Sequence, residues 1–287
     1  MGRVVGDSQA EEPGHPAALP SPLVVAHRGA SQDMAEHTLA AYRRAIDLGA
    51  DALECDVRLT ADGHVVCVHD RRIDRISDGT GVVSSQTLAE LQQHDFGSWW
   101  TSWDGDDAPD LDDERGSVLT LERLLELVTD SERPVGLAIE TKHPTRYAGY
   151  LERRVVETLE RFGLARPARH TRSPIWVMSF SEIAMRRMRQ LAPEIPAVFL
   201  MERVPLRCRT GWLPYEAAVA GPSMEIITKY PEFVERLRTH NKRVLVWTVD
   251  RMDDLDVCLD LDVDAVVSNR PAPVIEHLAR RGLRQRP

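Results

Sequence analysis

Residues 52–70 read ALECDVRLTADGHVVCVHD, and this stretch decides the fold. It holds two candidate strands, residues 52–59 and residues 64–69, which are separated only by the tetrapeptide T-A-D-G. A crossover between parallel strands needs about a dozen residues, and the D-G pair is a strong signal for a hairpin turn. We therefore predict an antiparallel hairpin that places Asp56 roughly opposite His69.

Along the rest of the chain, candidate strands alternate with helical patterns. When the second strand of the hairpin is set aside, eight strands remain, at residues 23–27, 52–59, 136–140, 175–180, 197–201, 217–220, 244–249 and 265–268. Helical patterns separate most of them, the first beginning after Thr38 and the others covering residues 121–128, 147–162, 181–191, 233–240 and 252–261. Such alternation favours a parallel sheet covered by helices, and eight strands close a (β/α)8 barrel. The sequence therefore predicts an α/β fold, a TIM barrel with a β-hairpin after its second strand.

Composition divides the chain into a tail, a barrel domain and an insertion. Residues 1–22 are rich in Pro, Gly and Glu and are expected to be disordered. Residues 23–280 are expected to form the barrel. Residues 71–117 interrupt the alternation and are too long for a plain loop, so we expect a small insertion above the barrel mouth. Its tryptophans are expected to pack it onto the barrel, with a substrate cleft as the alternative, and its acidic run is expected to be a solvated loop.

Charge and hydropathy exclude several classes of function. The net charge of −9 argues against a nucleic-acid-binding protein, because contact with phosphate backbones needs a basic face. No stretch approaches the roughly 18 apolar residues of a transmembrane helix, and the N-terminus lacks the apolar region of a secretory signal. The four cysteines form no C-x-x-C pair, and Cys55 and Cys67 are expected to be buried free thiols. A reducing, cytoplasmic location is therefore expected, and no oligomeric state is predicted.

Three acidic residues fall on predicted strands. Glu54 and Asp56 are two residues apart on one strand, so their side chains share a face, and Glu140 shares a face with Lys142 in the ETK sequence at the end of another strand. Buried carboxylates are costly unless a cation neutralises them, and hard divalent cations prefer clustered carboxylate oxygens. We therefore predict a divalent metal site. The alternatives are salt-bridged core acids and a structural ion pair between Glu140 and Lys142.

Two histidines end apolar strand runs beside charged residues. His27 is followed by Arg28 in VVAHRGAS, and His69 is followed by Asp70 in VVCVHD. In a barrel these strand ends open on one face, where active sites lie. Two imidazoles suit proton transfer to and from entering and leaving oxygens, while a metal with Arg28 and Lys142 suits a phosphate. These residues predict metal-assisted cleavage of a phosphodiester.

Several blocks of the sequence resemble the glycerophosphodiester phosphodiesterase family. The blocks are HRGAS, AEHTLAAYRRAIDLGADALECDVRLTADGHVVCVHD, AIETKHP and VLVWTVD, and the likeness runs from about residue 23 to residue 271. The H-R-G, E-x-D, D-G and H-D motifs occur in the order and spacing of the family, whereas the later blocks are individually weaker.

The resemblance implies a (β/α)8 barrel with a small insertion after the H-D motif. It also implies the hydrolysis of glycerophosphodiesters to an alcohol and sn-glycerol 3-phosphate, with Ca2+ or Mg2+ as the cofactor. The residues that match the family's site are His27 and His69 for the catalytic pair, Arg28, Lys142 and Trp247 for substrate contacts, and Glu54, Asp56 and Glu140 for the metal ligands.

The chain departs from the family's pattern at several positions. His37 stands in A-E-H-T where the family usually has P-E-N-T, and we interpret it as a helix-start residue without a catalytic role. Asp250 stands where many members have Asn, and Asn269 stands where the family often has Asp in T-D-x-P. The alcohol preference, the metal used and the division of acid and base roles between the histidines stay open.

Two other functions also stay open. A lipid-cleaving enzyme of the same barrel group, similar to phospholipase C or D, would need a way to reach the membrane, and the chain shows no basic amphipathic helix or anchor. A barrel that binds a phosphorylated metabolite without cleaving it would need a defect that the motifs do not show. The expected partner is a small-molecule glycerophosphodiester, with no nucleic acid and no membrane span.

Overall fold

The computed structural model describes residues 21–100, 116–167 and 173–284. The predicted tail therefore lies outside the described residues, apart from its last two positions. The acidic run of the insertion, residues 105–114, also lies outside them, as does Trp103.

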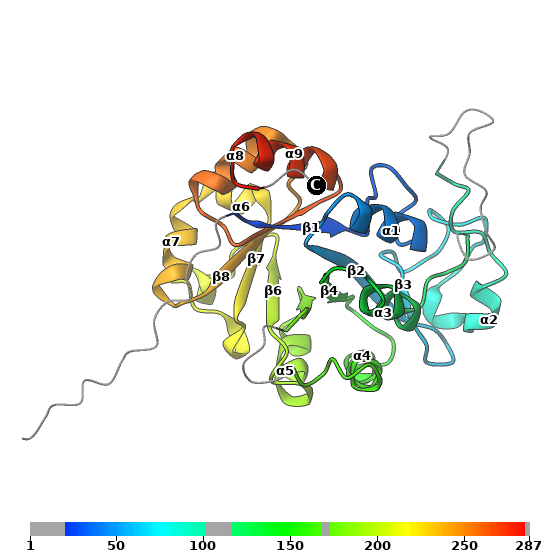
Figure 1. Ribbon diagram of the computed structural model, residues 1–287. Helices are drawn as coiled ribbons and strands as arrows, with labels where there is room; N and C mark the ends of the chain where they lie inside the picture. Colours follow the sequence, from blue (N-terminus) through cyan, green and yellow to red (C-terminus); the bar gives the residue numbers. More distant parts are fainter. Residues whose placement is uncertain (1–20, 101–115, 168–172, 285–287) are drawn as a thin grey trace, which may run out of the picture.

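A closed barrel of parallel strands forms the centre of the molecule (Figure 1). Its eight strands close on themselves because β1 pairs with both β9 and β2, and a ninth strand, β3, extends the sheet. The predicted TIM barrel is thereby confirmed. The strands within the described residues are β1 (Leu23–His27), β2 (Ala52–Leu59), β3 (Val65–Cys67), β4 (Gly136–Thr141), β5 (Ile175–Ser179), β6 (Ala197–Met201), β7 (Val219–Pro222), β8 (Arg243–Val246) and β9 (Ala265–Ser268).

The predicted hairpin is present, but its register differs from the expected one. β3 runs antiparallel to β2, with Val57 opposite Cys67. The amide of Val68 donates to the carbonyl of Asp56. Asp56 is therefore paired with Val68, and the expected pairing with His69 is wrong by one residue.

The turn of the hairpin explains this shift. Thr60 N donates to His64 O, so three residues separate the two and the turn is centred on Asp62. The expected register assumed a turn centred between Asp62 and Gly63. Gly63 has a positive φ of 84°, which a glycine adopts at little steric cost and which lets the chain accommodate the additional residue.

Strand β2 extends beyond the rim of the barrel. β4 pairs with it along residues 52–57 on one edge, while β1 pairs with residues 52–54 and β3 with residues 57–59 on the other edge. β3 therefore pairs with the part of this edge of β2 that lies beyond the end of β1 at His27. The side chains of the last residues of β2 consequently stand above the barrel mouth.

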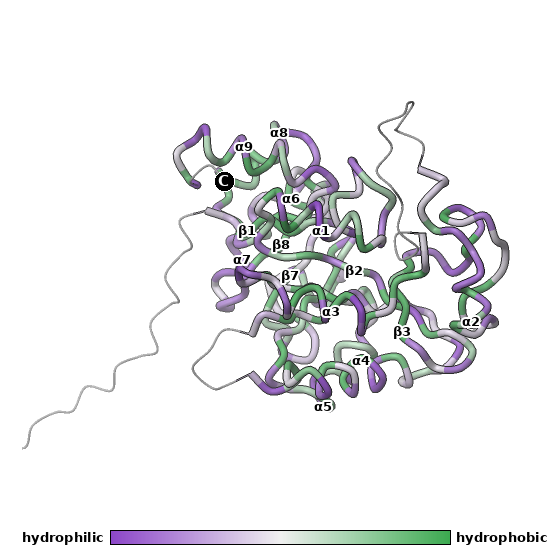
Figure 2. Tube along the Cα trace, turned by 45° about the vertical axis from the view of Figure 1, so that its right-hand side comes forward, coloured by the Kyte–Doolittle hydropathy of each residue, from purple (hydrophilic) through white to green (hydrophobic). Residues whose placement is uncertain are grey.

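Helices cover the outside of the barrel. They are α1 (Leu39–Asp47), α3 (Leu121–Thr129), α4 (Tyr150–Arg161), α5 (Glu182–Leu191), α6 (Met224–Lys229), α7 (Glu232–Thr239), α8 (Met252–Asp260) and α9 (Pro271–Arg280). Thr38 caps α1 as predicted, because its side-chain oxygen accepts from Ala41 N. Helices α6 and α9 were not predicted. Along the outer helices the trace alternates between hydrophilic and hydrophobic residues (Figure 2), and no described helix is both long and apolar enough to cross a bilayer.

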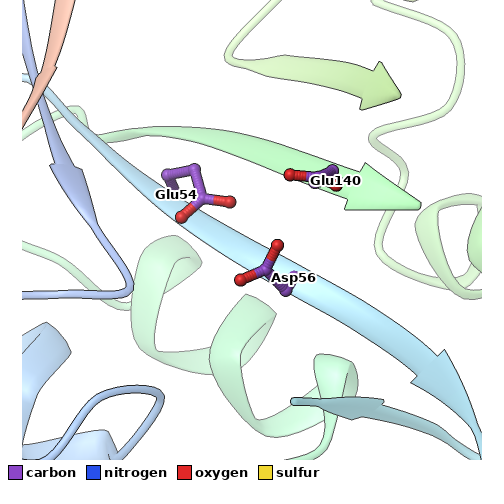
Figure 3. A group of neighbouring side chains, drawn as sticks. All are labelled: Glu54, Asp56 and Glu140. Atoms are coloured by element: carbon purple, nitrogen blue, oxygen red, sulfur yellow. The ribbon is translucent and has the colours of Figure 1, made fainter. Parts of the chain in front are cut away.

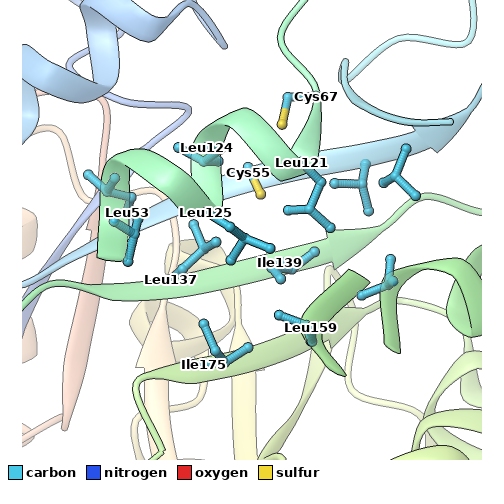
Figure 4. Close-up of a cluster of buried hydrophobic side chains, with 14 of the residues drawn as sticks. Leu53, Cys55, Cys67, Leu121, Leu124, Leu125, Leu137, Ile139, Leu159 and Ile175 are labelled. Atoms are coloured by element: carbon cyan, nitrogen blue, oxygen red, sulfur yellow. The ribbon is translucent and has the colours of Figure 1, made fainter. Parts of the chain in front are cut away.

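The main core lies between the sheet and the helices. Leu53 and Cys55 point outward from β2 against Leu121 and Leu125 of α3, as Figure 4 shows. Their neighbours Glu54 and Asp56 therefore face the opposite side, toward the interior of the barrel. All four cysteines are buried and free, which confirms the prediction for Cys55 and Cys67.

The insertion has a small core of its own. It contains the 3-10 helix η1 (Val83–Ser85) and the helix α2 (Leu88–Leu91). Ile73, Ile76 and Phe96 form a buried cluster with residues of the hairpin, and Trp99 packs against that cluster. Trp99 thus packs the insertion onto the barrel domain, as expected.

Candidate active site

Three carboxylates meet near the carboxyl ends of β2 and β4. Glu54 and Asp56 project from one side of β2, and Glu140 lies next to them on β4 (Figure 3). The register places Asp56 beside Glu140. The three side chains are buried, and one oxygen of each lies within 4.8 Å of an oxygen of the other two. The structure therefore brings together the three predicted metal ligands.

Asp56 is surrounded by two cations and a histidine ring. Its Oδ2 atom lies 3.0 Å from Arg28 Nε and 3.0 Å from His37 Nε2, and its Oδ1 atom lies 3.0 Å from Lys142 Nζ. Burial favours the neutral acid, but the hydrogen bond from His37 and the charges of Lys142 and Arg28 outweigh it and hold the pKa of Asp56 well below its usual value. Asp56 is therefore charged at neutral pH.

Glu54 and Glu140 are less completely neutralised. Glu54 Oε2 accepts from Arg28 N at 3.0 Å, whereas its Oε1 atom is buried without a hydrogen-bond partner among the described residues. Glu140 Oε1 lies 2.8 Å from Lys142 Nζ. Burial, followed by the charge of Asp56, raises the pKa of Glu54 well above its usual value and that of Glu140 to about 8.

This set of oxygen donors fits a divalent metal ion. One oxygen of Glu54 is buried without a partner in the described part of the chain, and both Glu54 and Glu140 have raised pKa values. These two observations indicate negative charge that the nearby side chains do not fully balance. Carboxylate oxygens are the ligands that Ca2+ and Mg2+ prefer. The side chains of Glu54, Asp56 and Glu140 could thus hold such an ion, as the sequence predicted.

His27 is oriented by a series of hydrogen-bonded side chains that follow the last two barrel strands. Its Nδ1 atom lies 2.7 Å from Asn269 Oδ1, and Asn269 Nδ2 donates to Asp250 Oδ2 at 2.7 Å. The Asp250 carboxylate can only accept hydrogen bonds, so the NH2 group of Asn269 faces Asp250 and its amide oxygen faces His27. His27 Nδ1 must therefore carry the proton and donate to that oxygen. His27 Nε2, which lies 3.9 Å from Glu54 Oε2, is then left without a proton. Burial, followed by the charge of Arg28, lowers the pKa of His27 to about 4.

The role of Asn269 was not predicted, although the sequence contained a signal for it. Asp250 and Asn269 depart from the family's pattern in opposite directions, an acid in place of an amide and an amide in place of an acid. The structure places these two side chains in direct contact. Two departures that exchange the same pair of residue types indicate a contact between them.

His69 is held by the carboxylate of the next residue, just before the insertion. Its Nδ1 atom lies 2.7 Å from Asp70 Oδ1, and Asp70 Oδ2 accepts from Arg75 Nε at 2.6 Å. Arg75 also donates to Glu36, at 2.7 and 3.0 Å, and Glu36 accepts from Arg28 at 3.1 Å. Arg75 and Glu36 were not predicted as site residues. The ion pair between Arg75 and Glu36, which are far apart in the sequence, connects the insertion to the barrel mouth.

His37 lies at the start of α1, as expected, but its ring belongs to the site. The ring is buried, with Nε2 3.0 Å from Asp56 Oδ2 and Nδ1 2.8 Å from the hydroxyl of Tyr42. The Tyr42 hydroxyl in turn donates to the carbonyl of Glu54 at 3.0 Å. His37 and Tyr42 therefore support the strand that carries the carboxylates, a role that the sequence did not reveal.

Most of the predicted site residues line a single pocket of about 450 Å3, the active-site pocket. Asp56 does not line it, but contacts Arg28 and Lys142 in its wall. Phe180, which was not predicted, forms an aromatic wall with Trp247, and their rings meet edge to face at 5.3 Å. The predicted residues in the lining are His27, Arg28, Glu54, His69, Glu140, Lys142 and Trp247.

A comparison with known protein families decides the membership of the chain. The model of the glycerophosphoryl diester phosphodiesterase family matches residues 27–273, which is most of the chain. The chain belongs to this family. The resemblance seen in the motifs is thereby confirmed, and with it the prediction of an enzyme of the phosphodiesterase class.

Several named members of this phosphodiesterase family are similar to the chain. The probable glycerophosphodiester phosphodiesterase 1 of Mycobacterium tuberculosis is 45% identical over 250 residues, which cover 87% of this chain and 90% of that protein. A glycerophosphodiester phosphodiesterase of Bacillus subtilis is 31% identical over 254 residues, which cover 87% of this chain and 84% of that protein.

Solved structures share the fold of the chain. An Oleispira antarctica phosphodiesterase, in complex with the product sn-glycerol-3-phosphate, matches with a TM-score of 0.74 and 24% identity, over 90% of this chain and 97% of that chain. A protein described as a putative glycerophosphoryl diester phosphodiesterase from Silicibacter pomeroyi matches with a TM-score of 0.77 and 23% identity, over 91% and 94% of the two chains. These likenesses show the TIM-barrel fold.

Proposed function

We propose that this protein hydrolyses glycerophosphodiesters to an alcohol and sn-glycerol 3-phosphate, with the help of one divalent metal ion. The observation that carries the proposal is the buried, unpartnered oxygen of Glu54 within a cluster of three carboxylates. Two histidines line the same pocket as Glu54 and Glu140. Membership of the family supports the same substrate class.

The residues that would hold the metal are Glu54, Asp56 and Glu140. When bound, Ca2+ or Mg2+ would neutralise the excess negative charge of this cluster and polarise a phosphoryl oxygen. Arg28 and Lys142 lie at the same cluster and line the pocket, so their charges are placed to orient a phosphate as well as to neutralise Asp56.

The partners of the two histidines suggest a division of roles. Asn269 is an uncharged acceptor and leaves His27 neutral with a bare Nε2 atom, which suits a base that takes the proton of the attacking glycerol 2-hydroxyl or water. Burial lowers the pKa of His69 too, and the charge of Asp56 and the hydrogen bond to Asp70 offset only part of that shift. Unlike the uncharged Asn269, however, the Asp70 carboxylate favours a protonated ring. His69 therefore suits the acid that protonates the leaving alkoxide.

The metal requirement can be tested on a panel of substrates and cations. After treatment with EDTA, the activity on glycerophosphocholine should be lost and should return with added Ca2+, Mg2+ or Mn2+. A divalent ion at 100 times its dissociation constant should also stabilise the fold by about 2.7 kcal/mol, which thermal unfolding measures without substrate. Full activity in EDTA would contradict the proposal. Cleavage of a diacyl phospholipid in preference to glycerophosphocholine would favour the lipid-cleaving alternative.

The roles of the histidines can be separated with two leaving groups. His27→Ala and His69→Ala should each lower kcat on glycerophosphocholine by about 10²- to 10⁴-fold. With a 4-nitrophenyl ester, whose leaving group needs no proton, His69→Ala should recover most activity and His27→Ala should not. Both variants should keep the thermal shift on metal addition. Recovery of the His27 variant in place of the His69 variant would reverse the assignment.

The location of the protein is also a proposal. All four cysteines are free and buried, which fits a reducing compartment such as the cytoplasm. Fractionation of cells that express the full chain would test this, because recovery outside the cytoplasmic fraction contradicts it.

A further inference from the structure

Next to the active-site pocket lies a second pocket that the proposed reaction does not use. It has a volume of about 250 Å3. Its walls come from the end of β2, the 3-10 helix η1 of the insertion and the loop between β4 and α4. The polar residues in its lining are Arg58, Arg71, Ser84, Lys142, Thr145 and Arg146. We call it the arginine pocket.

The arginine pocket carries a concentration of uncompensated positive charge. Within the described part of the chain, no carboxylate lies at ion-pair distance from Arg58, Arg71 or Arg146, and no acidic residue is found in the lining. At the mouth of the barrel, by contrast, Arg28 and Arg75 are each paired with carboxylates. In a chain with a net charge of −9, such a cluster is expected where an anion binds.

Arg58 is the least exposed of the three arginines, and its charge is met only by a carbonyl. It donates from Nε and Nη2 to the carbonyl of His69, at 3.0 and 2.7 Å. A bound anion would supply the negative charge that this guanidinium lacks.

The arginine pocket lies beside the active-site pocket, because strand β2 and Lys142 contribute to both. Lys142 lines both pockets. Arg58 follows Glu54 and Asp56 on the same face of β2, two residues beyond the last carboxylate and above the barrel rim. This arrangement allows one molecule to place a phosphodiester at the carboxylate cluster and a second anion in the arginine pocket.

The donors of the arginine pocket favour a phosphate over other anions. Guanidinium groups present paired N–H donors that match the spacing of phosphate oxygens. Arg146 and Tyr147 hold the two walls together, because both donate to the carbonyl of Ser84, at 3.5 and 2.9 Å. The pocket is thus a formed depression with several cations, and its volume exceeds that of a few water molecules.

We propose that the arginine pocket binds a second phosphate, carried by the alcohol part of the substrate. The enzyme would then prefer glycerophosphodiesters whose alcohol is itself phosphorylated over those with an uncharged alcohol. This inference rests on the proposed function, because it names the substrate class of the same site.

The preference can be measured with two matched substrates. One is the diester of sn-glycerol 3-phosphate with glycerol, and the other is the same diester with a phosphate on the distal glycerol. The wild-type protein with saturating metal should show a kcat/KM at least about tenfold higher for the phosphorylated diester, the gain that one additional charge-assisted hydrogen bond provides.

Two variants and one matched control connect the preference to the pocket. Arg71→Gln and Arg146→Gln should each lower the ratio of the two kcat/KM values by about tenfold, mainly through a higher KM for the phosphorylated diester. Arg72→Gln is the control, because Arg72 follows Arg71 in the sequence but pairs with Asp74 at 2.9 Å and does not line the pocket. Its ratio should match that of the wild type.

The outcomes separate the inference from the proposed function. Hydrolysis of both diesters without a preference, or a preference that Arg71→Gln and Arg146→Gln leave unchanged, would overturn the inference and leave the function standing. If neither diester is hydrolysed with any divalent metal, the proposed function fails and the inference fails with it.

Discussion

The barrel buries acidic side chains in two places, and the two differ in how their charge is balanced. At the barrel mouth, Glu54 and Glu140 have raised pKa values, and one Glu54 oxygen is buried without a partner among the described residues. On α4, Glu152 is fully buried and also has one oxygen, Oε2, without a hydrogen-bond partner among the described residues, but its Oε1 atom lies 3.0 Å from His143 Nε2 and 3.3 Å from Arg187 Nη1. Burial favours neutral Glu152, but these partners outweigh it and lower its pKa.

The difference separates a structural ion pair from a ligand site. Glu152 has Arg187 and the ring of His143 as partners, so its charge stabilises the fold. Glu54 and Glu140 repel Asp56 and each other, so in the absence of a cation their charges oppose folding. Burial of an acid alone therefore does not indicate function, whereas burial without sufficient countercharge does.

The largest expected effect is the loss of activity in Glu54→Gln. The substitution keeps the shape of the side chain and removes one carboxylate of the cluster, so kcat/KM should fall by at least about 10³-fold at a metal concentration that saturates the wild type. Glu152→Gln is the matched control, because it also removes one buried carboxylate and should keep activity within about threefold. Activity of Glu54→Gln within tenfold of the wild type would contradict a metal-ligand role.

The second-largest expected effect is on stability, and here Glu152, not Glu54, is the sensitive position. Glu152→Gln leaves His143 and Arg187 without their carboxylate, so the free energy of unfolding should fall by about 3 kcal/mol. Urea unfolding followed by circular dichroism measures this. Glu276→Gln, in an exposed pair with Arg280 on α9, should cost less than about 0.5 kcal/mol. Equal losses in the two variants would mean that Glu152 is not a structural ion-pair residue.

The pH dependence of stability sharpens the same contrast. The folded pKa of Glu152 lies below its ordinary value of 4.5, so the folded state binds its proton less readily than the unfolded state. The stabilisation from Glu152 is therefore fully present above that ordinary value and is lost as the pH falls through the lowered folded value. The stability difference between wild type and Glu152→Gln should narrow as the pH falls from about 7 to about 3, and a constant difference would argue against this linkage.

The smallest effect concerns the stability of Glu54→Gln without metal. In EDTA at neutral pH, this variant should be as stable as the wild type or more stable by up to about 1 kcal/mol, because a raised pKa means that the charged form of Glu54 destabilises the fold. Added Ca2+ should then stabilise the wild type more than the variant. Thermal unfolding with and without the ion tests both statements, and a clear loss of stability in EDTA would show that the Glu54 charge is already balanced by the protein.

Much of the fold and of the site followed from local spacing. The four-residue gap before His64 predicted the hairpin, and the period of two along β2 placed Glu54 and Asp56 on one face. The register of the hairpin did not follow from spacing, because a turn centred on Asp62, half a residue earlier than expected, moves the partner of Asp56 from His69 to Val68. The family motifs named the eight site residues, which the structure brings together.

The partners of these residues could not be read from spacing. Asn269 contacts His27 across 242 positions of the sequence, and Glu36 binds Arg75 of the insertion. His37 looked like a helix-start residue until the folded chain placed its ring against Asp56.

The sequence by itself determined the barrel, its hairpin and the set of chemical groups at the strand ends, because strand period and crossover length are local properties. Only the tertiary structure decided which charges are balanced and which are not. Within the described residues, Glu54 and Glu152 are both buried acids with one unpartnered oxygen, but Glu152 lies beside Arg187 and His143, whereas Glu54 lies beside two other carboxylates. Electrostatic energy depends on those distances through space, which spacing along the chain does not encode.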